Sequence, residues 1–191
     1  MLNRTAQTIE DPPIAKFLFA NTTMAWLWLV VRVYLGWKWL DAGLHKMTPA
    51  WLDGSAALKG FWTGTIAVPA EGRPAIAFDW YRDFIAFLLQ TESYTWFAKL
   101  VAYGEILIGI SLILGTFVGI SAFFGALLNW NFIMAGAAST NGLIFVLAIL
   151  LMLAWKTAGY ICLDYFLLSF LGTPWKASTP KPASQMEPQS A

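Results

Sequence analysis

This 191-residue chain has a single cysteine, Cys162, and a single histidine, His45. One thiol excludes a disulfide within the chain and any multi-thiolate metal or iron–sulfur site, and one imidazole excludes bis-histidine haem ligation within one chain. We therefore expect no haem, no iron–sulfur cluster and no metal site from this chain alone.

Charge is also scarce, because only 12% of the residues are charged and the net charge is +1, while 58% are hydrophobic. An ordinary soluble domain has roughly a quarter of its residues charged. A nucleic-acid-binding surface needs clustered Lys and Arg, which this balance argues against. The chain has 11 tryptophans, and tryptophan prefers membrane–water interfaces. The composition thus predicts a membrane protein whose partner is the lipid bilayer and not nucleic acid.

Four apolar stretches predict transmembrane helices, since about 20 apolar residues cross a hydrocarbon core. The predicted spans are about 22–44, 94–114, 117–136 and 143–163, with tight turns at Gly115–Thr116 and at residues 139–142. Only helices and closed barrels satisfy the backbone in lipid. The expected fold class is therefore all-α, an integral membrane four-helix bundle that occupies residues 22–171.

The remaining segments differ in composition. Residues 1–21 contain acids and two adjacent prolines but no continuous apolar stretch, so we expect a cytoplasmic segment and not a signal peptide. The long first loop, 45–93, contains an amphipathic pattern at 79–89 that predicts an interfacial helix. Residues 172–191 are rich in Pro and Ser and predict a disordered tail. Basic residues near both ends favour cytoplasmic termini for a multi-pass protein of the cell inner membrane.

Two charged residues lie near the middle of the first two predicted spans, Arg32 and Glu105. A lone charge at mid-membrane costs about 3 kcal/mol on insertion scales, so we predict an Arg32–Glu105 ion pair inside the bundle. The helix face that carries Arg32 and the helix face that carries Glu105 also carry small residues, which permit close helix approach. These residues are Gly36, Gly43, Ala98, Ala102 and Gly109. The pair either fixes helix register only or takes part in redox or proton chemistry.

A second polar group is predicted at the outer end of the first helix. Lys38, Asp41 and His45 follow an i, i+3, i+7 spacing and share one face, near the expected positions of Asn129 and Asn131. A lysine, a carboxylate, an imidazole and amide donors are suited to binding an anion and managing protons. The alternative interpretation is a snorkelling lysine and ordinary helix capping. The two asparagines lie nearly opposite one another on their helix, so one is expected to bridge helices while the other contacts a ligand.

A third polar group is predicted at the inner end of the fourth helix. Lys156, Tyr160 and Asp164 have i, i+4, i+8 spacing and would form a stripe. Lys156 could neutralise a semiquinone or quinol oxygen, or pair with Asp164 through a water molecule. A purely structural role for the stripe stays open.

Several segments of the chain resemble the DoxX/DoxD family, over roughly residues 27–168. The segments are NWNF at 129–132, the Ser-Thr-Asn turn at 139–141, AWKTAGYICLD at 154–164, GEILIGISLILG at 104–115 and RVYLGWKWLDAGLHK at 32–46. That family includes the large membrane subunit of thiosulfate:quinone oxidoreductase, which has a small partner subunit. By position, the family's recurring polar residues match Glu105, Asn129, Asn131, Lys156 and Asp164.

The resemblance implies a quinone-linked membrane oxidoreductase subunit that oxidises two thiosulfates to tetrathionate and reduces a quinone, its substrate. The predicted anion-binding residues are Lys38, Asp41, His45, Asn129 and Asn131, and the predicted catalytic residues are Arg32, Glu105 and Lys156. Electron transfer would then be direct or through a partner. The alternative hypothesis is a non-catalytic accessory subunit packed against a larger respiratory or photosynthetic membrane complex. A transporter is disfavoured, because the sequence has no inverted repeat with matched broken helices.

Overall fold

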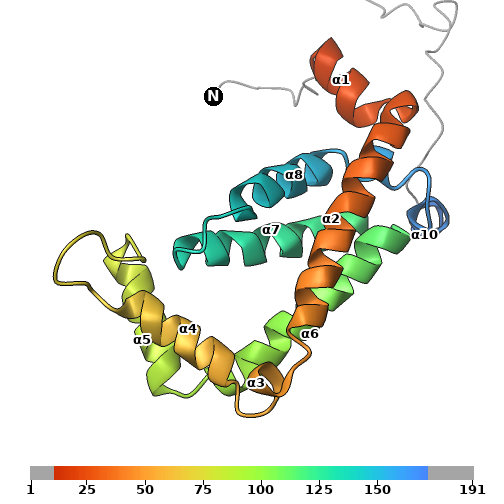
Figure 1. Ribbon diagram of the computed structural model, residues 1–191. Coiled ribbons are helices and arrows are strands. Elements are labelled where there is room, and N and C mark those ends of the chain that lie inside the picture. Colours follow the sequence, from red (N-terminus) through yellow and green to blue (C-terminus); the bar gives the residue numbers. More distant parts are fainter. Residues whose placement is uncertain (1–10, 172–191) are drawn as a thin grey trace, which may run out of the picture.

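The computed structural model describes residues 11–171, and within this range every regular element is a helix, which confirms the all-α prediction (Figure 1). The four longest helices are α2 (Ala25–His45), α6 (Tyr94–Leu114), α7 (Val118–Met134) and α8 (Asn141–Leu153). Helix α2 packs on α6 and α8, and α7 packs on α6 and α8. The predicted tail at 172–191 and the first ten residues lie outside the described range.

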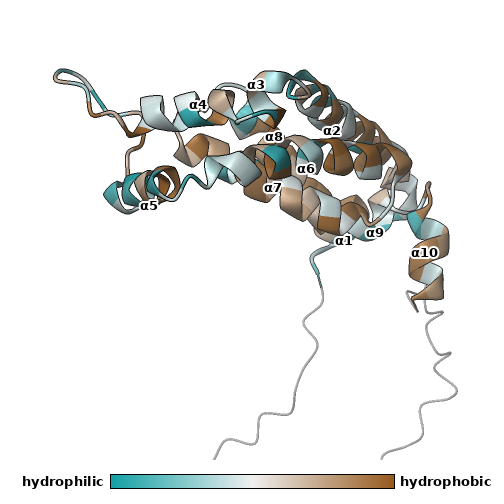
Figure 2. Ribbon diagram, turned by 90° about the horizontal axis from the view of Figure 1, so that it is seen from below, coloured by the Kyte–Doolittle hydropathy of each residue, from teal (hydrophilic) through white to brown (hydrophobic). Residues whose placement is uncertain are grey.

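Shorter helices complete the described part of the chain. They are α1 (Pro13–Ala20), η1 (Thr22–Met24), α3 (Pro49–Leu52), α4 (Ala56–Ile66), α5 (Asp79–Gln90), α9 (Trp155–Ala158) and α10 (Asp164–Phe170). The amphipathic segment predicted at 79–89 is α5, which carries both hydrophilic and hydrophobic residues (Figure 2). It pairs with α4, which the sequence analysis left within the loop, and the α4–α5 pair lies beyond one end of α7 (Figure 1).

Glycines bring α2 and α6 into close contact. A Cβ atom on Gly36 would lie 2.9 Å from the carbonyl oxygen of Gly109, and one on Gly109 would lie 2.5 Å from the backbone nitrogen of Leu40. A Cβ atom on Gly43 would lie 2.9 Å from the backbone nitrogen of Ile106. Because these distances leave no room for a methyl group, only glycine allows the two backbones to approach this closely. The small-residue faces predicted from the sequence are confirmed.

Helix α6 is the only single helix in the described range that is long and apolar enough to cross a membrane. Taken as one broken span, α1 with η1 and α2 also passes this test, with a bend of 51°. Helices α7 and α8 are apolar but shorter. The outer faces of the helices expose large apolar side chains, such as Trp26, Val30 and Leu107. Membrane association is thus supported by one span or two, and the four-span arrangement stays a prediction.

The predicted fourth span at 143–163 is wrong as a continuous helix, because α8 ends at Leu153 and the short α9 follows. The chain then turns, and α10 begins at Asp164. The polar stripe predicted along one helix therefore does not form. Asp164 instead places its carboxylate and its backbone N–H against the α6–α7 turn, where both form hydrogen bonds.

Candidate functional site

The predicted Arg32–Glu105 ion pair is wrong. Arg32 is buried, and its Nη1 donates to the carbonyl oxygens of Leu112 and Ile113 at 2.6 and 3.2 Å. These are carbonyl groups of the last turn of α6, which have no partner within the helix. Glu105 instead accepts a hydrogen bond from Lys46 Nζ at 2.6 Å.

The antiparallel register of α2 and α6 explains the error. The prediction placed the two side chains at equal depth because each lies near the middle of its helix. The glycine contacts set Gly36 against Gly109 and Ile113, so the middle of α2 faces the last third of α6. Arg32 lies against Leu112, which is seven residues further along α6 than Glu105. At 1.5 Å per residue, this separation is roughly 10 Å, too far for Arg32 to reach Glu105.

Arg32 and Asp164 hold the two ends of the α6–α7 turn, and we call this pair of residues the turn clasp. Asp164 is fully buried, and its carboxylate accepts hydrogen bonds from the backbone N–H groups of Phe117 and Val118 at 2.6 and 2.8 Å. It thereby caps the first turn of α7, while Arg32 caps the last turn of α6. Burial raises the pKa of Asp164, and the two backbone N–H groups and Arg32 oppose that shift. The polar atoms of the turn clasp form hydrogen bonds within the protein, except for Arg32 Nε, which is buried without a partner.

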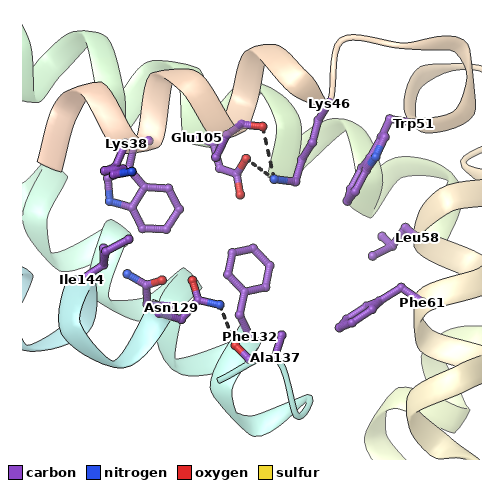
Figure 3. Close-up of a pocket in the computed structure, with 13 residues that line it drawn as sticks. Lys38, Lys46, Trp51, Leu58, Phe61, Glu105, Asn129, Phe132, Ala137 and Ile144 are labelled. Atoms are coloured by element: carbon purple, nitrogen blue, oxygen red, sulfur yellow. Dashed lines mark hydrogen bonds and ion pairs between the residues drawn. The ribbon is translucent and has the colours of Figure 1, made fainter. Parts of the chain in front are cut away.

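Lys46 and Glu105 line a cavity of about 310 Å³ near the opposite end of the α2–α6 pair (Figure 3). Glu105 is almost completely buried, and the Lys46 side chain is largely so. Lys46 Nζ also lies 5.3 Å from the ring centre of Trp51 and 6.0 Å from that of Phe132, distances typical of cation–π contacts. The ion pair is therefore held at the wall of a hollow and fixed by aromatic rings.

Three buried polar atoms of the cavity-lining residues have no hydrogen-bond partner. They are Trp39 Nε1, Asn129 Nδ2 and Glu105 Oε1, which are two donors and one acceptor. In the close-up, Asn129 lies across the cavity from Glu105 (Figure 3). Buried polar groups without partners are rare and costly, and a cluster of them around one hollow is typical of a site that a ligand completes. We call Trp39, Lys46, Glu105 and Asn129 the polar site.

A larger hollow of about 680 Å³ adjoins this cavity, between the α4–α5 pair and helices α6 and α7, and we call it the apolar groove. The cavity and the groove have Leu58, Phe61 and Phe132 in common. Most of the groove is lined by aliphatic and aromatic side chains. The two hollows thus share a wall made of one aliphatic and two aromatic side chains.

Asn129 and Asn131 take different roles, as their opposite positions on the helix predict. Asn129 belongs to the polar site, whereas Asn131 lines the apolar groove. Tyr81 on α5 donates its phenol O–H to the backbone and side-chain oxygens of Asn131, each at 3.1 Å. Burial raises the pKa of Tyr81, so the phenol stays protonated and keeps donating at neutral pH. Asn131 therefore ties α7 to α5.

The other predicted site residues do not gather at the polar site. Lys38 lies at the edge of the cavity, but Asp41 and His45 pair with each other on an exposed face of α2. Lys156 is exposed, with its Nζ 5.4 Å from the ring centre of neighbouring Trp155. Neither Arg32 nor Lys156 lines either hollow. The predicted anion-binding group is thus represented in the cavity by Lys38 and Asn129.

Trp39 and Lys46 are not among the site residues predicted from the sequence. Both could have been found from their spacing, because Arg32, Trp39 and Lys46 recur every seven residues and lie along one stripe of α2. Lys46 was counted among the loop residues, although it follows Gly43 by one helical turn. A residue on the same stripe as two close-packing glycines faces α6, where Glu105 needs a partner.

Within residues 11–171 no group of three or more His, Cys, Asp or Glu side chains is arranged to hold a metal ion. Comparisons of the chain with protein-family models, with characterised proteins and with solved structures find no match. The proposals below therefore depend on the geometry of the site and on the sequence resemblance.

Proposed function

We propose that this chain is a DoxX/DoxD-like membrane subunit of a quinone-linked oxidoreductase and that the polar site binds the quinone head group. The observation that carries the proposal is the set of three unpartnered buried atoms on Trp39, Asn129 and Glu105. A quinone carbonyl oxygen accepts hydrogen bonds from the indole N–H and the amide, and a quinol hydroxyl donates to the carboxylate. The ligand would thus complete every unsatisfied group of the cavity.

The roles of the ion pair follow from its contacts. Glu105 Oε2 is held by Lys46, so Oε1 is the oxygen that faces a ligand. Glu105 is the proton-exchanging group in this proposal, because a carboxyl group within hydrogen-bond reach of a quinone oxygen can take up a proton and pass it to that oxygen as the quinol forms. Lys46 stabilises the ionised carboxylate and orients it. Arg32 has a structural role here, and Lys156 has none at the cavity.

Thiosulfate is the proposed electron donor on the basis of the family resemblance. Two thiosulfate ions form one sulfur–sulfur bond and give tetrathionate and two electrons, and the quinone takes up these electrons with two protons to become a quinol. Lys38 lines the cavity and supplies a cation that an approaching oxyanion would meet in this proposal. A small partner subunit would complete the enzyme.

The first test is binding of a tail-free benzoquinone to the purified protein in nanodiscs, measured by isothermal titration calorimetry. Asn129→Leu removes a donor to a quinone carbonyl and should weaken benzoquinone binding about tenfold, the effect of losing roughly 1.4 kcal/mol. Glu105→Gln removes the carboxylate acceptor and should weaken binding of the corresponding tail-free quinol by a similar factor. Asp41→Asn is the matched control, because it neutralises an exposed carboxyl of α2 outside the cavity. Equal affinity in all four proteins would contradict the proposal.

The second test follows quinone reduction after thiosulfate is added to membranes that hold the chain with its native partners. Loss of reduction in Glu105→Gln, with unchanged protein level and with activity kept in Asp41→Asn, is the expected result. Quinone binding without thiosulfate-dependent reduction, together with co-purification in a larger pigmented complex, would favour the accessory subunit. The exposed aromatic side chains of Phe166 and Phe170 on α10 offer such a complex a packing surface.

A further inference from the structure

The apolar groove differs from the polar site in what it can recognise. Its polar side chains include Tyr81 and Asn131, which already bond to one another. None of the unpartnered buried atoms in the described residues belongs to the groove. An apolar ligand part suits this groove, since most of its wall is apolar and it holds no unpartnered buried donor or acceptor.

The two hollows adjoin and share three lining residues, and this closeness allows one ligand to reach both. They meet at Leu58, Phe61 and Phe132, with unpartnered polar atoms on one side and apolar walls on the other. A molecule with a compact polar head and a hydrocarbon tail matches this division. We propose that the apolar groove holds the prenyl tail of the quinone whose head group occupies the polar site, an inference that rests on the function proposed above.

In this proposal the tail passes the shared wall at Phe132. Phe132 contacts the Lys46 ammonium on the cavity side and lines the groove on the other side. A tail that leaves the head group beside Phe132 then lies in the groove between the α4–α5 pair and helices α6 and α7, where Tyr81 and Asn131 line the wall and tie α5 to α7. The α4–α5 pair is thus part of the quinone site and more than a surface loop.

Gly104 offers a way to block the groove without disturbing the fold. It lines the groove on α6, and a Cβ atom added there would have no atom within 4 Å. Gly104→Leu therefore places a side chain into open space, and leucine is also a better helix former than glycine. Gly64→Leu on α4 is the matched control, because a Cβ atom there also meets nothing within 4 Å and Gly64 does not line the groove.

The experiment compares a tail-free benzoquinone with its decyl-tailed analogue, titrated calorimetrically against wild type, Gly104→Leu and Gly64→Leu in nanodiscs of one lipid composition. Partitioning of the tail into the bilayer is the same for all three proteins and cancels in the comparison. Gly104→Leu should weaken the tailed quinone about tenfold relative to Gly64→Leu, as expected from displacing roughly two methylene groups. The tail-free quinone should bind all three proteins alike.

The outcomes separate the two proposals. If wild type fails to bind the tail-free quinone, the head-group proposal is overturned. If wild type binds it but Gly104→Leu leaves the tailed quinone unaffected, the groove is not the tail site. An equal loss for both quinones in Gly104→Leu would also overturn the tail proposal, because the substitution would then act on the polar site.

Discussion

The two ends of the α2–α6 pair bury charge in opposite ways. At the turn clasp, Arg32 and Asp164 form hydrogen bonds with backbone groups at two helix ends, and neither residue lines a hollow. At the polar site, Lys46 and Glu105 pair beside a cavity whose walls keep unpartnered donors and an acceptor. Burial of a charge therefore does not by itself indicate a functional site. The polar site differs in having three unpartnered atoms on residues that line one cavity, whereas the turn clasp has a single unpartnered atom, Arg32 Nε, and lines no hollow.

The largest effect should come from removing one half of the buried ion pair. Lys46→Met leaves the Glu105 carboxylate buried without its cation, which should lower the free energy of unfolding by about 3 kcal/mol. The double variant Lys46→Met/Glu105→Gln should recover most of this loss, because no uncompensated charge is left. Unfolding by SDS titration measures both. A double variant as unstable as the single one would show that the loss does not come from charge.

Arg32→Leu should have the next largest effect, because it leaves carbonyl groups at the end of α6 without a donor. The expected loss is about 2–3 kcal/mol, as for hydrogen bonds made by charged groups. Affinity of the folded fraction for a tail-free quinone should be unchanged, since Arg32 does not line the cavity. A selective loss of quinone affinity with normal stability would contradict the structural role of Arg32 and indicate a role in binding.

Asp164→Ala should cost about 1–2 kcal/mol by removing the cap of α7. Asp164→Asn keeps one carbonyl acceptor and should lose less. Thermal unfolding in detergent, followed by tryptophan fluorescence, compares the two variants. Identical unfolding temperatures for wild type and Asp164→Ala would contradict the capping role.

Asn129→Leu should give the smallest change in stability while still lowering quinone affinity. Since the Asn129 amide is buried without a partner, an apolar replacement should leave the free energy of unfolding within about 0.5 kcal/mol of wild type or raise it. Quinone affinity should still fall as described above. A large loss of stability in this variant would instead place Asn129 among the structural residues, like those of the turn clasp.

Local patterns in the sequence predict α2, α6 and the turn at Gly115 well, because they depend on apolar length, small residues and a left-handed glycine. The break in the predicted fourth span could not be predicted in this way, because Asp164, at the start of a separate helix, bonds to the backbone of Phe117, 47 residues earlier in the chain. The prediction of an Arg32–Glu105 ion pair was wrong for a related reason. Depth along each helix was estimated separately, whereas the glycine contacts between the two helices decide which residues meet.

The seven-residue spacing of Arg32, Trp39 and Lys46 also limits how this chain can change in length. Each residue advances a helix by about 100°, so inserting or deleting one residue between Arg32 and Lys46 would turn one of them away from α6 while the other stayed in place. No side-chain substitution elsewhere restores that phase. Relatives of this protein should therefore keep the number of residues along 33–45 constant, and residue type there should vary only at positions other than Gly36, Trp39 and Gly43.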